Sequence, residues 1–252
     1  MEDKRPDQQI IYGIHPVLEA LESGARIDRV FMEKTHKGPN IDMIRQRLKE
    51  QEIPLLFVPS YKLDRLTRKN HQGVVAMMAA IEFMDIEEIV SAVQEEGRTP
   101  FILALDGVTD VRNFGAIART AECAGVDALL IPMKETAPIN EDAIKTSSGA
   151  LLRMPVCRTK NFRKTLENLK NYGLSLVSCS EKGTESIYDD VLSEATVIVM
   201  GAEGTGISDE VLKMSDHVAA IPMKGVTASL NVSVACGIIL FETLRQRELG
   251  KS

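Results

Sequence analysis

The chain has 252 residues, of which 44% are hydrophobic and 26% are charged. This composition is typical of a globular protein and excludes collagen, a coiled coil and a disordered tail. Apolar runs such as 238–241 are too short to span a membrane, and no apolar stretch near Met1 could act as a signal peptide. We therefore expect a soluble, cytoplasmic protein.

The first 81 residues alternate short strands with helices. Apolar runs predict strands that begin near Ile10, Arg29, Leu55 and Val74, and helical spacing covers 15–21 and 42–52. A further helix, with Asp85 as its N-cap, ends at Gly97. That helix is either a connector or the first helix of a second unit.

A second alternation of strands and helices fills the rest of the chain. Fully apolar runs predict strands at 101–105, 128–131, 174–177, 197–200 and 218–221. Strands that are apolar throughout are buried on both faces, which is typical of a parallel sheet covered by helices. Helices are expected from about Asn113 to Ala124, across Glu141–Ser147, and from Asn231 to about Glu248. The fold class is therefore α/β, with a small N-terminal domain and a larger second domain.

The net charge of −6 is unevenly distributed along the chain. Residues 1–81 carry 13 Lys and Arg against 11 Asp and Glu, whereas residues 82–252 carry 17 against 25. Two stretches, 62–71 and 153–170, are locally basic. Affinity for phosphate depends on such patches rather than on the total charge. Each patch alone is more simply explained as a solvated face, so charge does not identify the partner.

The cysteines indicate neither a metal site nor a disulfide framework. Cys123, Cys157, Cys179 and Cys236 form no Cys-x-x-Cys pair and do not cluster with the four histidines. Zinc sites and disulfide frameworks need closer spacing. We expect all four to be small, buried apolar residues.

Three unusual loops follow apolar strands of the second domain, at 106–121, 201–208 and 221–235. Ligands of an open parallel sheet bind outside the carboxyl ends of its strands, so these loops are the candidate site. The second loop reads G-x-x-G-x-G, which differs from the dinucleotide-binding G-x-G-x-x-G, and no P-loop motif occurs. A tight turn from strand to helix explains these glycines equally well, with Ser208 as the cap of the next helix.

The third loop carries Thr227, Ser229 and Asn231 just before the last helix. Free N–H groups at a helix N-terminus bind carboxylate or phosphate, although an ordinary N-cap explains the same residues. Arg119 lies inside the helix predicted after the first loop, among small residues. A guanidinium at that position either extends over the helix surface or binds an anionic substrate.

Together, the three loops resemble the three sequence motifs of the SpoU/TrmH family of RNA ribose 2′-O-methyltransferases, within the SPOUT class. The matching positions are Asn113, Gly115–Ile117 and Arg119–Ala121 in the first loop, Gly201–Gly204, Gly206 and Ser208 in the second, and Ile221–Met223 with Ser229–Ala235 in the third. Residues 11–17 and 71–74 resemble the family's N-terminal substrate-binding domain. That domain and the opening at 106–110 are most similar to the subgroup that methylates a guanosine of 23S ribosomal RNA.

The resemblance implies an L30e-like α/β domain followed by a SPOUT α/β domain whose parallel sheet carries a deep trefoil knot. It assigns residues 10–82 to RNA binding, 83–98 to a linker or connecting helix, and 99–249 to catalysis. The knot is implied by the resemblance alone, because knots are rare exceptions to the rules of chain topology.

The resemblance also implies S-adenosylmethionine as the cofactor and no metal. Gly201, Ile221 and Leu230 match the backbone contacts to this cofactor, and Met223 and Ala235 match its adenine pocket. Because glycine lets the backbone approach a ligand, we expect a side chain at Gly201 to obstruct the pocket without unfolding the protein.

Asn113, Arg119, Glu203, Ser229 and Asn231 match the family's catalytic residues. The family arginine has been proposed as a general base, but a guanidinium has a pKa above about 12 and is always charged. We interpret Arg119 instead as a clamp that binds an RNA phosphate and stabilises the developing alkoxide.

Members of the family are homodimers in which this arginine reaches the neighbouring cofactor site. A candidate dimer face lies on the final helix, at Val234, Ile238, Leu240, Phe241 and Leu244. Packing of that helix on its own sheet explains the same residues equally well.

We therefore expect an S-adenosylmethionine-dependent RNA ribose 2′-O-methyltransferase that acts on a guanosine of 23S ribosomal RNA. A tRNA methyltransferase is the first alternative, and the separate N-terminal domain argues against it. A non-catalytic RNA-binding member of the fold is disfavoured by the intact motif residues. A nicotinamide-dependent enzyme is disfavoured by the order of the glycines.

Overall fold

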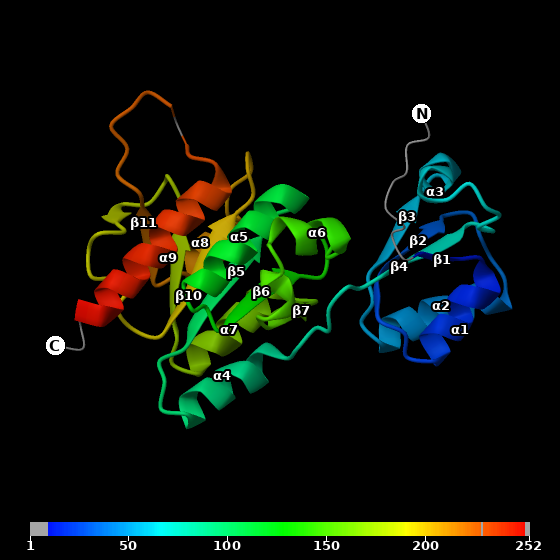
Figure 1. The fold of residues 1–252 in the computed structure, drawn as a ribbon, viewed down its shortest axis with the longest axis horizontal. Coiled ribbons are helices and arrows are strands. Elements are labelled where there is room, and N and C mark those ends of the chain that lie inside the picture. The colour runs from blue at the N-terminus through cyan, green and yellow to red at the C-terminus, as the bar shows by residue number, and fades with distance from the viewer. Residues whose placement is uncertain (1–9, 228, 250–252) are drawn as a thin grey trace. The chain divides into compact units, whose positions relative to one another are not determined.

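The structure is a computed structural model that describes residues 10–227 and 229–249. Within these residues the chain forms two compact units (Figure 1). The first consists of residues 10–82 with 139–141, and the second of residues 83–138 with 142–249. In the described part of the chain, no helix is both long enough and apolar enough to cross a membrane.

The first unit is built on a four-stranded sheet. Its elements are β1 (Ile10–Tyr12), α1 (Ile14–Glu22), β2 (Ile27–Glu33), α2 (Pro39–Glu50), β3 (Leu55–Val58), α3 (Ser60–Leu66) and β4 (Val74–Met78). The strand order is β1-β4-β2-β3, in which β4 runs antiparallel to β1 and β2, and β3 runs parallel to β2. Strands β1, β2 and β3 therefore all end at the same end of the sheet, where β4 begins.

The core of the first unit lies between the sheet and the two longer helices. Val17 and Leu21 of α1 and Ile44 of α2 pack on Val30 and Val74 of the sheet. The spacing of these helical residues places them on one face of each helix, so burial of that face holds the helices against the strands. Helix α3 packs against β2 and β4 and contributes the buried Leu63.

The remaining elements follow an almost regular alternation of strand and helix. They are α4 (Ile86–Glu95), β5 (Phe101–Asp106), α5 (Val111–Cys123), β6 (Ala128–Pro132), α6 (Glu141–Thr146), the short 3₁₀ helix η1 (Ala150–Leu152), β7 (Val156–Thr159), α7 (Phe162–Asn171), β8 (Ser175–Cys179), β9 (Glu185–Ser186), β10 (Thr196–Gly201), α8 (Asp209–Met214), β11 (His217–Ala220) and α9 (Val232–Leu249). The seven strands have the order β7-β6-β5-β10-β8-β11-β9, and each neighbouring pair is parallel. The predicted α/β fold with a parallel sheet is confirmed.

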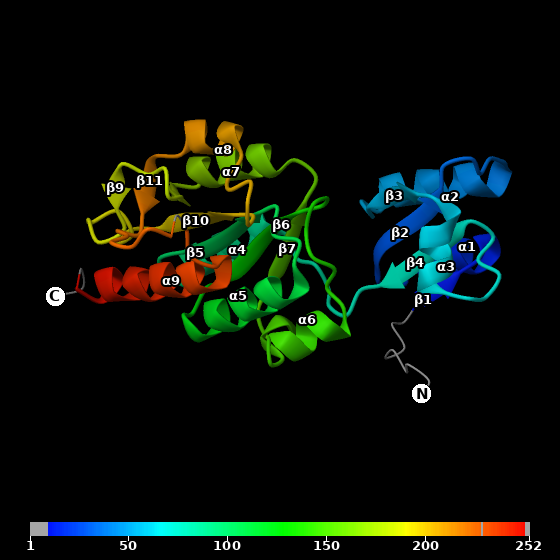
Figure 2. The same cartoon turned by 90° about the horizontal axis from the view of Figure 1, so that it is seen from above.

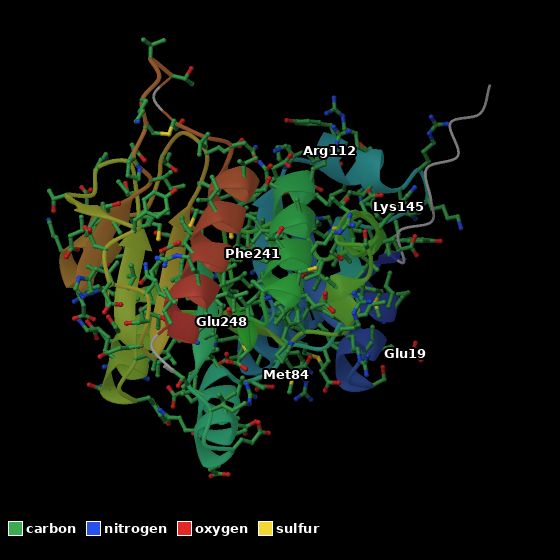
Figure 3. All side chains as sticks on the ribbon, turned by 60° about the vertical axis from the view of Figure 1, so that its left-hand side comes forward. Glu19, Met84, Arg112, Lys145, Phe241 and Glu248 are labelled. Atoms are coloured by element: carbon green, nitrogen blue, oxygen red, sulfur yellow. The ribbon has the colours of Figure 1, made fainter. Side chains whose placement is uncertain are left out.

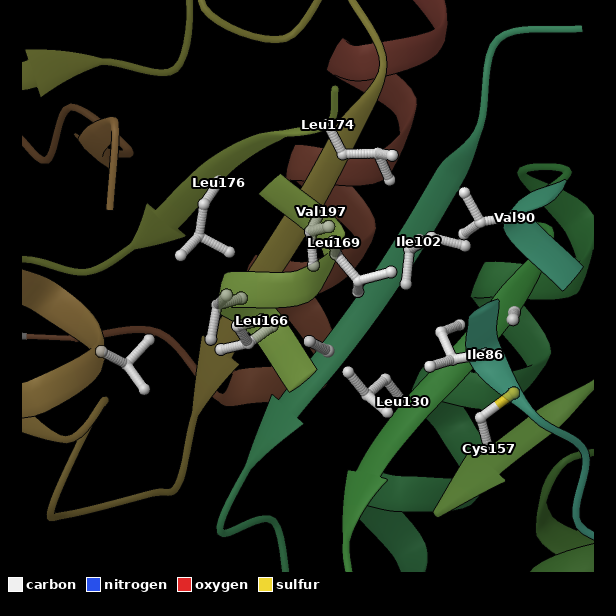
Figure 4. Packing of buried hydrophobic residues seen from close by; sticks show 14 of the residues in the cluster. Ile86, Val90, Ile102, Leu130, Cys157, Leu166, Leu169, Leu174, Leu176 and Val197 are labelled. Atoms are coloured by element: carbon white, nitrogen blue, oxygen red, sulfur yellow. The ribbon is translucent and has the colours of Figure 1, made fainter. Parts of the chain in front are cut away.

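Helices cover both faces of the parallel sheet. Helices α7 and α8 lie on one face, and α5 and α9 lie side by side on the other (Figure 2). Helix α4 packs on the same face as α7. On the first face, Ile86 and Val90 of α4 are buried with Leu166 and Leu169 of α7 against the central strands (Figure 4). Helix α4 is thus part of the core of the second unit. The near-continuous burial of β5, β6 and β10 follows from this covering of both faces.

Acidic N-caps fix where two helices begin. The carboxylate of Asp85 accepts hydrogen bonds from the N–H groups of Glu87 and Glu88, as predicted. The carboxylate of Asp110 accepts from Arg112 N and Asn113 N at 3.0 and 2.8 Å. Helix α5 therefore begins at Val111, two residues before its predicted start.

The expectation that all four cysteines are buried is wrong for Cys123. Cys157, Cys179 and Cys236 lie in the core, whereas Cys123 is exposed on the last turn of α5. The buried residues of α5 lie on its opposite side, at Phe114, Ile117, Ala118 and Ala121. Spacing along the helix, rather than residue type, decides the exposure of Cys123.

The last turns of α9 are anchored to the beginning of two strands. The Arg247 guanidinium donates hydrogen bonds to the carbonyls of Thr99, Pro100 and Glu194 and stacks on the buried ring of Phe101 at 4.5 Å. Burial lowers the pKa of Arg247 to about 10. These contacts hold the C-terminal end of α9 beside the beginning of β5 and β10.

Candidate active site

The three loops predicted from the sequence lie at one end of the parallel sheet. Strands β5 and β10 are neighbours, with Gly201 level with Asp106, and they lead into the first and second loops. Strand β11 lies two places from β10 and leads into the third loop. Because parallel strands carry their carboxyl ends to the same end of the sheet, loops far apart in the sequence meet here.

Asn231 joins all three loops through its side chain. Its Nδ2 donates hydrogen bonds to Asn113 Oδ1 at 3.0 Å and to Glu203 Oε1 at 2.6 Å. Its Oδ1 accepts from Ser233 N at 3.0 Å and from Ser233 Oγ at 2.5 Å. Asn231 is therefore both the N-cap of α9 and the donor that connects the first and second loops.

The capping role fixes the direction of the Asn231 amide. Because Oδ1 is engaged by the N–H groups at the start of α9, both hydrogens of Nδ2 point away from the helix. An aspartate would cap the helix equally well but could not donate to Glu203 or Asn113. The site thus requires asparagine rather than any capping residue.

The second loop folds back on the end of β10. Ala202 and Gly206 exchange two backbone hydrogen bonds, at 3.2 and 2.9 Å. The N–H of Ser208 donates to Asp106 Oδ2 at 2.9 Å, which ties this loop to the end of β5. Ser208 precedes α8 but makes no side-chain cap, so the predicted capping hydroxyl is wrong.

Gly201 is required because the second loop packs closely against it, and not because a ligand in the cavity needs the space. A Cβ atom on Gly201 would collide with the backbone of Gly206 and Ile207. We expected a side chain at Gly201 to obstruct the pocket and leave the fold intact. That expectation is wrong, because the side chain would first collide with the backbone of the loop itself. Gly115 is constrained similarly, since a Cβ there would lie 2.6 Å from Thr146 Cβ. Both motif glycines allow close packing of chain segments.

A cavity of about 390 Å³ lies between the second loop, the third loop and the start of α9. All five residues predicted to bind the cofactor line it, namely Gly201, Ile221, Met223, Leu230 and Ala235. Three of the five predicted catalytic residues, Glu203, Ser229 and Asn231, also line it. Asn113 adjoins it through its hydrogen bond to Asn231.

Sequence reasoning missed one wall of the cavity. Cys179, Ser180 and Glu181, at the carboxyl end of β8, face the second and third loops. Burial raises the pKa of Cys179 to about 12, so this residue contributes a neutral thiol. The signal available in the sequence was the apolar strand 174–177, whose end is a candidate position for ligand contacts.

Arg119 stands apart from this cavity. It is exposed on α5, and it makes no hydrogen bond or ion pair with the described residues. Glu122, three residues later, is instead paired with Arg153 at 2.9 Å. The guanidinium of Arg119 is therefore free to bind a ligand or a residue of another chain.

One stripe of α9 is exposed and apolar. Val234 and Phe241 are exposed by 52% and 53%, and Figure 3 shows Phe241 on the outside of α9. Helical spacing places the half-buried Ile238 between them on the same face. The prediction is wrong for Leu240 of the candidate dimer face, which is fully buried in the second unit. The described residues contain no group of three or more His, Cys, Asp or Glu side chains that could hold a metal ion.

Two family models match the chain over most of its length. The model of the SpoU rRNA Methylase family matches residues 100–241. The model described as RNA 2′-O ribose methyltransferase substrate binding matches residues 10–84. The first match includes Asn113, Arg119, Glu203, Ser229 and Asn231.

Individual relatives agree with these matches. A Staphylococcus haemolyticus protein named for the TrmH family of tRNA/rRNA methyltransferases is 35% identical over 239 residues, which is 94% of this chain and 96% of that protein. The structure of an AdoMet-bound rRNA methyltransferase from Sinorhizobium meliloti is 25% identical, with a TM-score of 0.58, and the alignment covers 94% of this chain and 86% of that one. The TrmH/SpoU tRNA-modifying enzyme from A. aeolicus is 31% identical, with a TM-score of 0.55, over 66% of this chain and 85% of its own.

Proposed function

The chain belongs to the SpoU rRNA methylase family, and we propose that it transfers the methyl group of S-adenosylmethionine to a ribose 2′-hydroxyl of RNA. It is an RNA methyltransferase of the SpoU/TrmH type. The observation that carries the 2′-hydroxyl proposal is the meeting of Asn113, Glu203 and Asn231 beside the cavity. Three residues from three distant loops hold one another in a fixed arrangement there.

The cavity fits S-adenosylmethionine in size and chemistry. Its volume lies within the range of sites for small molecules. Apolar side chains of Ile221, Met223 and Leu230 suit the flat face of an adenine, and the carboxylates of Glu181 and Glu203 suit a cation. When bound, S-adenosylmethionine supplies a methyl group that is already activated by its positive sulfur.

With the methyl donor activated, the protein's main task is to position the ribose. Asn231 orients Glu203 and Asn113, and it is itself fixed at the start of α9. Asn113 retains its Nδ2 hydrogens for an RNA oxygen, because only its Oδ1 is engaged by Asn231. Ser229 lines the cavity and offers a hydroxyl to the same region. We assign these four residues to the catalytic site.

Arg119 acts as the phosphate clamp of a site completed by a second copy of the chain. Its exposure, its lack of partners among the described residues and its position outside the cavity support this role. The apolar stripe of the exposed Val234 and Phe241 with the half-buried Ile238 supports a homodimer that buries this face of α9. A guanidinium placed near the 2′-oxygen lowers the cost of the charge that develops as the proton leaves.

The substrate we propose is 23S ribosomal RNA, with a guanosine as the modified nucleotide. Two observations support ribosomal RNA over tRNA. The substrate-binding model matches residues 10–84, and the tRNA-modifying relative from A. aeolicus aligns with only two thirds of the chain. We assign residues 10–82 to RNA binding and 99–249 to methyl transfer. Residues 83–98 connect the two along the chain, and their helix α4 packs in the core of the second unit. We propose a cytoplasmic location, which is consistent with an enzyme that modifies RNA.

The test is transfer of tritiated methyl groups from S-adenosylmethionine to RNA purified from a strain that lacks the gene. We expect the label in 23S ribosomal RNA. Alkaline hydrolysis then locates the product, because cleavage needs a free 2′-hydroxyl and a 2′-O-methylated nucleotide remains in a resistant dinucleotide. Label on a base rather than on ribose contradicts the 2′-O assignment. Label confined to tRNA contradicts the ribosomal substrate.

A further inference from the structure

One end of the first unit's sheet is far more basic than the other. Strands β1, β2 and β3 end there and β4 begins there, so segments 33–38 and 59–73 both adjoin it. We call this the basic end. Its segments carry six cations, namely Lys34, Lys37, Lys62, Arg65, Arg68 and Lys69, and only two acids. At the opposite end, segments 23–26, 51–54 and 79–82 carry Arg26 against Glu52 and Glu82.

The two acids at the basic end are both in contact with histidines. Glu33 lies 3.6 Å from His36 Nδ1, and Asp64 lies 3.1 Å from His71 Nε2. The lysines and arginines of this end are therefore little compensated by carboxylates. Such an uncompensated cluster attracts a polyanion.

Aromatic rings are interleaved with these cations. Three of the four aromatic residues in 10–82 carry a cation over the ring. The Arg65 guanidinium lies 5.8 Å from the ring of Tyr61, that of Arg45 lies 5.7 Å from Phe57, and Lys69 Nζ lies 5.6 Å from Tyr12. Tyr12 is the last residue of β1, and Phe57 and Tyr61 flank the end of β3.

Two of these rings, Phe57 and Tyr61, are exposed, in contrast to the ring beneath Arg247 in the second unit. Phe57 and Tyr61 are exposed by 51% and 54%. Phe101, beneath Arg247, is only 2% exposed and belongs to the core. Burying half of a large apolar ring is favourable, so a partner that covers Phe57 and Tyr61 gains free energy.

We propose that the basic end binds unpaired nucleotides of the RNA substrate, with bases stacked on Phe57 and Tyr61 and phosphates on the surrounding lysines and arginines. This inference rests on the proposed function, since it presumes an RNA substrate. An RNA duplex offers its backbone and a shallow groove, whereas unpaired bases present flat faces to aromatic and guanidinium groups. Exposed rings beside cations therefore favour a loop or single strand over a helix.

The experiment measures binding of the full chain to two fluorescent RNA probes by anisotropy. One probe is a short single strand, and the other is a fully paired hairpin of the same composition. Phe57→Ala and Tyr61→Ala should each weaken binding to the single strand roughly tenfold, because base–aromatic stacking is lost. Binding to the hairpin should change less than about twofold, because phosphate contacts are retained. Tyr61→Phe, which keeps the ring, should bind as the parent does.

The matched control is Tyr188→Ala. Tyr188 is exposed by 55% on the second unit, so it has the same chemistry at a surface without this arrangement of cations. Its loss should leave both affinities unchanged. Equal weakening of the single strand and the hairpin by the Phe57 and Tyr61 variants overturns the inference, as does no weakening of either. Thermal unfolding confirms that each variant is folded.

A direct optical readout separates stacking from charge. The chain contains no tryptophan, so Phe57→Trp introduces a single indole at the basic end. The single strand should quench its fluorescence strongly and the hairpin weakly. Methyl transfer by the parent chain is measured on the same preparations. If the parent chain methylates RNA but the indole responds equally to both probes, only this inference is contradicted. If the parent chain neither binds nor methylates RNA, the proposed function and this inference are both contradicted.

Discussion

Asn231 and Glu203, which are 28 positions apart in the chain, are joined by a 2.6 Å hydrogen bond from Nδ2 to Oε1. The same Asn231 side chain caps α9 through Oδ1. One residue therefore fixes both the start of a long helix and the position of the second loop. Its two roles use different atoms, so a substitution can separate them.

The substitution Asn231→Asp should keep the cap and break the connection. Aspartate caps helices as well as asparagine does, so the roughly 1 kcal/mol that the cap contributes to the free energy of unfolding should be retained. A carboxylate facing Glu203 repels it, and turnover should fall roughly a hundredfold as the site loses its arrangement. Asn231→Ala removes the cap as well and should cost about 1 kcal/mol in denaturant unfolding. Normal methyl transfer by the aspartate variant would contradict the role of this hydrogen bond.

Gly201→Ala should destabilise the protein rather than only block a ligand. Its Cβ would strike the backbone of Gly206 and Ile207, and relieving such overpacking costs about 1–3 kcal/mol. Calorimetry should show weaker cofactor binding together with a lower unfolding temperature. The matched control is Gly225→Ala in the third loop, where a Cβ meets open space. Equal stability of the two variants would show that Gly201 is not constrained by the loop.

Local patterns predicted most of the fold and the composition of the candidate site. Apolar runs identified β5, β6, β8, β10 and β11 but missed β7, whose second half is the polar Arg158 and Thr159. The rule for carboxyl ends of parallel strands identified the three loops. Local patterns could not predict the order of strands in the sheet, because they do not encode which strand pairs with which. Strand β8 lies between β10 and β11, and this placement brings Ser180 and Glu181 to the cavity.

Contacts between distant segments also changed the interpretation of single residues. Glu122 is the carboxylate nearest to Arg119 along the sequence, but it is paired with Arg153 from a different segment. Gly201 is explained by a backbone that folds back on it, which its neighbours in sequence do not reveal. The trefoil knot, which only the family resemblance implied, stays a prediction.

Thiol labelling should distinguish Cys123 from the other three cysteines. Burial raises the pKa of Cys157 and Cys179 to about 12 and that of Cys236 further, so these thiols are neutral near pH 8. The thiolate is the reactive form, and Cys123 alone among the four is exposed. Iodoacetamide should therefore modify Cys123 first, as followed by peptide mass spectrometry. Modification of Cys179 before Cys123 in the native protein would contradict the packing of the sheet.

Arg119→Ala should reduce the turnover rate and leave the stability of the protein nearly unchanged. Because Arg119 has no partner among the described residues, its removal should change the free energy of unfolding by less than about 0.5 kcal/mol. Cofactor affinity should be nearly unchanged, since the cavity is lined by other residues. Turnover should fall by orders of magnitude if the guanidinium acts on the reacting ribose and phosphate. Arg119→Lys keeps the charge without the planar fork, so partial activity favours the clamp.

Mixing two inactive variants tests whether the site is shared between copies. An Arg119→Ala subunit keeps an intact cavity, and an Asn231→Asp subunit keeps an intact Arg119. In a mixed dimer, the arginine of the second subunit can complete the cavity of the first, so about one site in two should work. Refolding the two variants together should restore methyl transfer to RNA, whereas each variant refolded alone should remain inactive. A mixture as inactive as its components would mean that Arg119 serves the cavity of its own chain, because no exchange of subunits could then recover a complete site.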